Sequence, residues 1–192
     1  MSTTPELNTA RLVLRPLQLS DAEAIQQLFP QWEVVRYLNA KVPWPYPPDG
    51  ALSYLRDACL PAMAAGREWH WSIRLLAQPE QLIGSISLMD LPDNHRGFWM
   101  APAWQGQGYI TEACEVIDAF WFLTLGREVM RVPKAVPNEA SRRISQRGGM
   151  RLLRTGQGDF VSGCLPQEVW EITRQQWLDR QSARRDADAH PR

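Results

Sequence analysis

The clearest pattern of hydrophobic positions begins after Gly108 and predicts a helix. Its apolar residues recur at helical spacing and would share one face: Ile110, Ala113, Ile117, Phe120, Trp121 and Thr124. A turn with two glycines, Gln105-Gly106-Gln107-Gly108, precedes the helix, and an apolar strand candidate from Gly97 to Pro102 precedes the turn. The predicted order is therefore strand, glycine turn, helix.

The chain before this unit alternates between helical and extended patterns. A capping box from Ser20 to Glu23 predicts a helix that ends near Phe29. The prolines of residues 42–48 exclude a central strand or a helix interior, because they lack N–H donors. The other elements predicted here are strands at 11–16, 69–75 and 82–88, helices at 33–38 and from 49 to Gly66, and a hairpin turn at 78–80.

Beyond the helix, which Gly126 ends, the chain predicts a strand, a short helix and two more strands. Asn138 and Gly148 have the properties of an N-cap and a stop for the short helix. Past Arg180 the sequence is polar and has no apolar face, so a disordered tail is expected. The predicted ranges are a strand at 128–136, a helix at 139–147, and strands at 150–155 and 169–173 with turns at 156–158 and 162–163.

The glycine turn has the features of an anion-binding loop. Glycine reaches backbone conformations closed to other residues, so several N–H groups can converge on one point. The N-terminus of the following helix adds free N–H groups and the positive end of its dipole, which suits a phosphate. No Gly-Lys-Ser/Thr follows the turn, which excludes a nucleotide P-loop, and the third glycine of a dinucleotide fingerprint is missing.

The same residues resemble a family signature. Gln105-Gly106-Gln107-Gly108-Tyr109-Ile110 resembles the Q/R-x-x-G-x-G/A motif of the GNAT-type N-acetyltransferases, with Ile110 in place of the final Gly or Ala. The Gly-Phe-Trp from Gly97 and the Thr-Glu-Ala from Thr111 are similar to one subgroup, the bacterial ribosomal-protein N-terminal (alanine/serine) acetyltransferases. Asn138-Glu139-Ala140-Ser141 and Gly148-Gly149-Met150 resemble that subgroup's N-x-x-S and K-x-G-F/M elements.

This resemblance, which covers residues 9 to about 175, implies an α+β protein with the GNAT-type acyl-CoA N-acyltransferase fold. The fold is a mixed, mostly antiparallel sheet with a splayed central parallel pair, flanked by helices. The domain would span 9–178, with flexible termini at 1–8 and 181–192. The parallel pair would be the strands at 97–101 and 128–136, where Pro133 marks either the splay or an edge or β-bulge.

Acetyl-CoA would be the cosubstrate, and its pyrophosphate would lie on the glycine turn. Arg142 would meet a phosphate of the coenzyme, or else be a solvated surface residue. The contacts that the resemblance implies are Met100, Ala101, Gln105, Gly106, Gln107, Gly108, Tyr109, Ile110, Thr111, Asn138, Ser141 and Arg142.

The resemblance places Ser141 near the sulfur of coenzyme A, as a hydrogen-bond donor to the leaving thiolate. Candidates for a base or proton relay are Asp90, His95 and also Asp93, just before the strand beside the thioester. The Glu that is common in the superfamily is replaced around Arg96. An α-amine has a pKa near ~8, against about 10.4 for lysine, so an N-terminal acceptor needs less help from a base.

Aromatic residues would border the acceptor pocket. Trp44 and Tyr46 lie in the stiff proline-rich loop, and Trp71 and Trp99 lie on predicted strands. A rigid loop would present aromatic walls to a substrate at little entropic cost. The alternative for these side chains is ordinary packing in the core.

Composition narrows the classes of function. The chain has 192 residues, 44% of them hydrophobic, which suits one domain. Lys and Arg (21) balance Asp and Glu (21), which argues against nonspecific binding to nucleic acid or to an anionic membrane. No transmembrane or signal pattern is present, so a cytoplasmic protein is expected. The spacing of the three cysteines and three histidines suggests no metal site.

These observations favour an acetyl-CoA-dependent N-acetyltransferase that acetylates a protein N-terminal α-amine by direct transfer in a ternary complex. Two alternatives stay open: an N-acetyltransferase for a small amine, amino acid or antibiotic, and a catalytically inactive coenzyme A-binding regulatory module. The expected partners are acetyl-CoA and an amine acceptor, with no nucleic acid and no membrane, and a homodimer is a compatible assembly.

Overall fold

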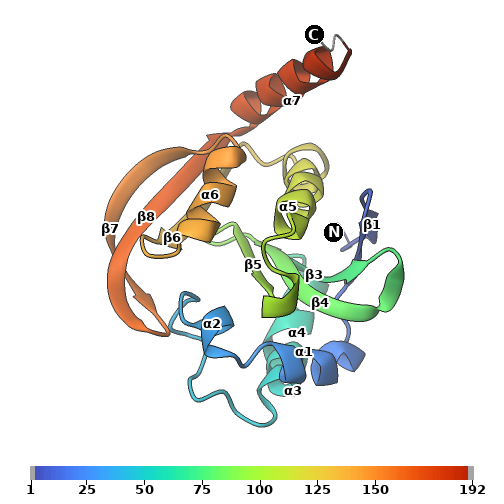
Figure 1. The fold of residues 1–192 in the computed structure, drawn as a ribbon, viewed down its shortest axis with the longest axis vertical. Coiled ribbons are helices and arrows are strands. Elements are labelled where there is room, and N and C mark those ends of the chain that lie inside the picture. The colour runs from blue at the N-terminus through green and yellow to red at the C-terminus, as the bar shows by residue number, and fades with distance from the viewer. Residues whose placement is uncertain (1–2, 190–192) are drawn as a thin grey trace.

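Two antiparallel β-sheets and the helices packed on them form the structure (Figure 1), a computed structural model that describes residues 3–189 and side chains up to Ala187. The first sheet has the strand order β1-β2-β3-β4-β5, and the second has the order β6-β8-β7. The strands are Leu7–Asn8 (β1), Leu12–Pro16 (β2), Glu68–Leu75 (β3), Gln78–Met89 (β4), Arg96–Met100 (β5), Val129–Ala135 (β6), Arg151–Phe160 (β7) and Gly163–Thr173 (β8).

The helices fall into two groups in Figure 1, with α1, α3 and α4 at one end of the molecule and α5 and α6 nearer the other. A π-helical turn, Leu55–Cys59, joins α3 to α4, and a second, Phe120–Thr124, continues α5. The helices are Ala22–Leu28 (α1), Trp32–Val35 (α2), Gly50–Tyr54 (α3), Leu60–Ala64 (α4), Tyr109–Ala119 (α5), Glu139–Arg147 (α6) and Arg174–Ala189 (α7).

Two hydrophobic clusters form the core. The larger joins the first sheet, α5, β6 and β8, and its fully buried members include Trp71, Ile86 and Ile117. The smaller lies under α1, α3 and α4 and includes Val35 and Leu55. Most of the apolar stripe predicted on the helix after Gly108 is buried, whereas Ile110 is partly buried and Thr124 is exposed. Each fully buried aliphatic side chain stabilises the fold by about 1.5–3 kcal/mol.

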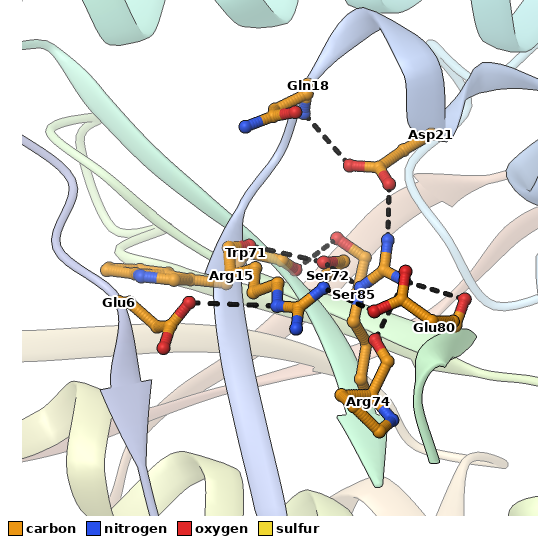
Figure 2. Close-up of polar contacts among 10 residues, drawn as sticks. Glu6, Arg15, Gln18, Asp21, Trp71, Ser72, Arg74, Glu80 and Ser85 are labelled. Carbon is orange, nitrogen blue, oxygen red and sulfur yellow. Dashed lines mark hydrogen bonds and ion pairs between the residues drawn. The ribbon is translucent and has the colours of Figure 1, made fainter. Parts of the chain in front are cut away.

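A buried ion pair attaches the start of α1 to β3. Arg74 Nη2 donates to Asp21 Oδ1 at 2.5 Å, and Arg74 Nε donates to Ser72 Oγ at 3.0 Å. The second oxygen of Asp21 accepts from the backbone N–H of Gln18 at 2.9 Å (Figure 2). The capping box is therefore formed by Gln18 and Asp21, two residues before the predicted box of Ser20 and Glu23, because a 3-10 turn at 19–21 precedes α1.

Two predicted turns are wrong because strands continue through them. Leu75 pairs with Gln78, so the hairpin between β3 and β4 turns at 76–77 rather than at 78–80. Gly156 and Gly158 lie within β7, opposite residues of β8, and the chain turns at 161–162. A side chain at position 158 would collide with the side chain of Gln167, so this glycine serves close cross-strand packing instead of a turn.

Secondary structure extends into both of the ranges predicted as flexible termini. Leu7 and Asn8 pair with β2, and the indole N–H of Trp71 donates to the carbonyl of Pro5 at 2.7 Å. At the other end α7 runs to Ala189, because Trp177 packs on Phe122 and anchors the first turns of the helix. Residues 1–2 and 190–192 lie outside the described part. Among residues 3–189, no helix has the length and apolar composition needed to cross a membrane.

Candidate active site

Strands β5 and β6 meet at one end and separate from there on. The N–H of His95 donates to the carbonyl of Arg131 at 2.8 Å, and the N–H of Arg131 donates to His95 Nδ1 at 2.9 Å. Three residues further along both strands, the Lys134 ammonium lies 4.6 Å from the ring centre of Phe98. Because both strands advance in the same direction from one contact to the next, they run parallel. Within residues 3–189, β5 then pairs with β4 and β6 with β8, and neither pairs with the other.

The splayed parallel pair predicted for the fold is therefore present as the boundary between the two sheets. Pro133 lies in β6 opposite Val169 of β8. Because proline has no N–H to donate, it fits a strand whose other edge is unpaired. Pro133 therefore lies on an edge strand that faces the gap, so the splay and the edge are the same feature here, and the continuous register with β8 shows no β-bulge.

The glycine turn directly follows β5 and leads into α5, as predicted. Gly106 and Gly108 have φ angles of +75° and +82°, which other residues rarely adopt. The N–H groups of residues 106–108 donate to no atom of the described residues. The side chain of Gln105 donates to the carbonyl of Met100 at 2.9 Å, which fixes the turn to the end of β5. The turn thus presents free N–H groups together with the N-terminus of α5.

Two arginines that sequence reasoning missed lie beside this turn. Arg11 donates to the carbonyl of Gln107 at 3.1 Å and to Glu112 at 2.7 Å, and its guanidinium lies 4.6 Å from the ring centre of Tyr109. Arg147, at the end of α6, lines a groove of about 500 Å³ along α5. Thr111 lines the groove as well, whereas Ile110 packs against the larger core. Glu112 pairs with Arg11 and lines the same groove, so Arg147 is the arginine of the two that has no carboxylate partner among the described residues.

The N-terminus of α6 has the predicted geometry. Asn138 is its N-cap, since its side-chain oxygen accepts from the N–H of Ser141 at 3.2 Å. Ser141 is only 6% exposed, and its hydroxyl makes no hydrogen bond within the described residues, so a donor is available. Arg142 was expected to contact a phosphate, but its guanidinium instead donates twice to Glu168, at 2.7 and 2.8 Å.

The acid–base candidates before β5 lie at the wrong end of the strand. Asp90 pairs with Arg127 at 2.7 Å, and Asp93 pairs with Arg131 and Arg154. His95 accepts the bond from Arg131 and stacks on Trp121, and burial lowers its pKa. At about 3.3 Å per residue, roughly 16 Å of strand separate His95 from Met100 and the glycine turn. The catalytic roles predicted for Asp90 and His95 are therefore not supported.

The position where the superfamily often carries a Glu is part of a buried ion pair. Arg96 Nη1 donates to both carboxylate oxygens of Asp118 on α5, at 2.6 and 2.5 Å. Burial raises the pKa of Asp118, while the guanidinium opposes this shift. Arg96 therefore fixes β5 to α5 and cannot act as a base.

Two of the four predicted acceptor aromatics share a partner, and the other two lie apart from them. Tyr46 and Trp99 both contact the ring of Phe29, at 5.1 and 5.3 Å between ring centres. Trp44 is 42% exposed and lies 5.6 Å from Trp32. Trp71 is fully buried in the larger core, so its predicted contact with an acceptor is wrong. Alternation along β3 turns Trp71 towards α5, as shown by its edge-on contact with Phe120.

Solved structures with this fold are acetyltransferases. The RimL ribosomal L7/L12 alpha-N-protein acetyltransferase in complex with coenzyme A superposes with a TM-score of 0.75 at 15% identity, over 88% of this chain and 98% of that one. Mutant forms of the spermidine/spermine N-acetyltransferase SpeG from Vibrio cholerae superpose with a TM-score of 0.71 at 16% identity, over 90% and 99%. These likenesses show the fold.

Sequence comparison gives the family. The uncharacterised N-acetyltransferase YoaA of Bacillus subtilis (strain 168) is 29% identical over 152 residues, which are 77% of this chain and 83% of YoaA. The family model of the acetyltransferase (GNAT) domain matches residues 11–151. The chain therefore belongs to the GNAT family and is an acetyl-CoA-dependent N-acetyltransferase.

Proposed function

We propose that this enzyme transfers acetyl from acetyl-CoA bound at the glycine turn to a protein N-terminal α-amine. The observation that carries the proposal is the turn itself, whose N–H groups at 106–108 have no partner in residues 3–189 and adjoin the separated ends of β5 and β6. The pyrophosphate would lie on these N–H groups beside Arg11 and Arg147, and the pantetheine arm would lie between the strands.

The chemistry needs a neutral amine, an aligned thioester and a donor for the leaving thiolate. Ser141, buried and with a free hydroxyl at the start of α6, would supply that donor. Asp90 and Asp93, at the closed end of β5, are paired with arginines, so neither serves as a strong base at the open end. An α-amine, with a pKa near ~8, is partly neutral near pH 7 without a base, whereas a lysine amine is almost entirely protonated.

RimL acts on a protein α-amine according to its name, which supports this acceptor. The name of SpeG supports a second candidate, a polyamine acceptor. We favour the N-terminus of an extended peptide, because an α-amine is neutral near pH 7 more readily than an alkyl amine of the lysine type.

Substituting Gly108 by valine should weaken coenzyme A binding at least tenfold, which corresponds to about 1.4 kcal/mol. A β-branched residue disfavours the φ of +82° by about 1–2 kcal/mol, so the turn would rearrange and its N–H groups would no longer converge. Isothermal titration calorimetry with coenzyme A measures the effect.

Gly126→Val is the matched control for this substitution. Gly126 also has a positive φ, +64°, and open space around it, but it follows α5 at the opposite end from the turn. It should incur similar backbone strain and leave coenzyme affinity unchanged. Equal affinity of Gly108→Val and the wild type would exclude the turn as the coenzyme site.

The acceptor class can be read from one peptide that carries both a free α-amine and an internal lysine. Because deprotonating lysine near pH 7 costs about 3.4 pK units, acetyl should appear chiefly on the α-amine. Tandem mass spectrometry after a short reaction locates it, with spermidine assayed in parallel. Acetyl mainly on the lysine, or faster turnover of spermidine than of the peptide, would contradict an N-terminal acceptor.

A further inference from the structure

A buried lysine lies where β5 and β6 separate, and neither the fold nor the proposed coenzyme site explains it. Lys134 is 7% exposed, and its ammonium group, which is not fully enclosed, has no ion pair and no hydrogen bond within residues 3–187. Its contact across the boundary is the ring of Phe98, 4.6 Å away on the other strand. Burying an unpaired ammonium is costly, so such a group points to a role beyond packing.

The choice of lysine at this position is itself informative. The chain contains 21 basic residues, of which Lys41 and Lys134 alone are lysines and the rest are arginines. Arginine stays protonated at any ordinary pH, whereas lysine can give up a proton when it is buried. Burial lowers the pKa of Lys134 to about 7, and the nearby charge of Arg96 adds to this effect. Lys134 can therefore both give and regain a proton near neutral pH.

The face of the sheet on which Lys134 lies separates it from the acceptor aromatics. Side chains alternate along β5: Arg96 and Phe98 face α5, and Trp99 faces Phe29 beside α1. Lys134 contacts Phe98, so it lies on the α5 side. The charged or titratable groups that act on it from β5 and α5 are Arg96, Asp118 and Cys114. Glu168 of β8 lies directly opposite Lys134 in the strand pairing, but its carboxylate accepts from Arg142 of α6 and makes no ion pair with Lys134 among the described residues.

An amine that enters past Trp44 and Trp99 would therefore approach the thioester from the side opposite Lys134. The departing sulfur, in contrast, would lie between the strands, within reach of the α5 side. Lys134 and Ser141 both lie close to the connection between β6 and α6. Lys134 is one residue before the end of β6, and Ser141 is about 4.5 Å along α6 from its N-cap. Lys134 and Ser141 thus flank the end of the same strand.

We propose that Lys134 is the catalytic acid that protonates the sulfur of coenzyme A as the carbon–sulfur bond breaks. The inference rests on the proposed coenzyme site. The neutral amine of the acceptor attacks the thioester carbon, the C–S bond breaks with its electron pair on sulfur, and a proton of the Lys134 ammonium passes to that sulfur. The new amide nitrogen loses its extra proton to water, and Lys134 regains a proton from water.

The energetics of this transfer are favourable. An ordinary thiol has a pKa of about 8.5, so an ammonium with a pKa of about 7 gives its proton to a thiolate downhill. General acid catalysis of this kind typically contributes about 100- to 10,000-fold. Ser141 would orient and stabilise the sulfur while Lys134 supplies the proton.

The first test follows Lys134 directly in the wild-type protein. With two lysines in the sequence, labelling with lysine that carries ¹³C at Cε gives two resonances, and Lys134→Met assigns them. The Lys134 resonance should titrate near pH 7 and should shift when coenzyme A saturates the protein, while exposed Lys41 is the internal reference. A Lys134 resonance unmoved by coenzyme A would overturn the proposal.

The second test uses kcat as a function of pH. Because Lys134 acts in its protonated form, wild-type kcat should fall as the pH rises through the pKa of this group in the ternary complex. Lys134→Met should lower kcat roughly 100-fold at pH 7 and lose this fall, and the affinity for coenzyme A should change less than threefold. Lys134→Arg should be equally slow, because it keeps the charge but does not release the proton.

Lys41→Met is the matched control and should behave like the wild type. Thermal unfolding near pH 6 verifies the fold of Lys134→Met, which loses a buried charge and should be at least as stable as the wild type. Full activity in Lys134→Arg would overturn the role of Lys134 as an acid and leave it an electrostatic role. An unchanged kcat and pH profile in Lys134→Met would overturn the proposal for Lys134 without affecting the proposed acetyl transfer. No acetyl transfer by the wild type to any amine tested would overturn the proposed function as well.

Discussion

Replacing Arg96 by methionine should lower the free energy of unfolding by about 3–5 kcal/mol. The substitution leaves the Asp118 carboxylate buried without the guanidinium that now donates to both of its oxygens. Asp118 would have to take up a proton or draw water into the larger core. Because the pair fixes β5 to α5, the glycine turn between them should also become less well ordered.

Urea unfolding at pH 7 measures the loss of stability. Two further variants test whether the loss comes from the buried charge that is left unpaired. The double variant Arg96→Met with Asp118→Leu removes both charges and should recover most of the lost stability, because apolar replacements of a buried pair are often neutral. Arg56→Met removes one partner of an exposed pair with Asp57 and should have little effect. Equal stability of Arg96→Met and Arg56→Met would mean that the Arg96–Asp118 pair is not buried as described.

Replacing Ser141 by alanine should lower kcat roughly 10- to 1000-fold, the range expected for loss of one transition-state donor. The N-cap contact should survive, because Asn138 accepts from the backbone N–H of residue 141 rather than from the side chain. The affinity for coenzyme A should therefore stay close to that of the wild type, and the loss should be in kcat instead of KM. Steady-state kinetics combined with calorimetry separates the two quantities.

Ser145→Ala is the matched control for Ser141. Ser145 lies one turn further along α6, is fully buried, and its hydroxyl has no partner within the described residues. Removing an unpartnered buried hydroxyl costs little stability, and an enclosed group does not reach the coenzyme. Its kcat should match the wild type. A kcat of Ser141→Ala equal to that of Ser145→Ala would remove Ser141 from the chemistry.

Secondary structure was predictable where the signal was local and periodic. The strand, glycine turn and helix from residue 96 to 119 were predicted from apolar spacing and from two glycines that the structure shows at positive φ. Local signals were wrong where a residue type serves two purposes. The glycines of β7 were read as turn residues, but their contacts come from the opposite strand, which the sequence pattern does not reveal.

The predicted site divides along the same line. The backbone N–H groups of the turn and the Asn138 cap depend on a few neighbouring residues, and both have the expected geometry. Asp90 and His95 were selected for their residue type just before β5, but the splay opens at the other end of the strand. Arg142 was selected for its charge, which Glu168 on β8 neutralises.

The sequence by itself determined the order of the elements, the anion-binding turn and the family signature, because each depends on spacing within a short stretch of chain. Only the tertiary structure decided which charges are free. It brings Arg11 to the turn from almost a hundred residues away, pairs Arg96 with Asp118, and leaves Lys134 buried without an ion pair among the described residues. The physical reason is that charge pairing and burial depend on distance in space, and a charged residue looks the same in sequence whether or not its partner is near.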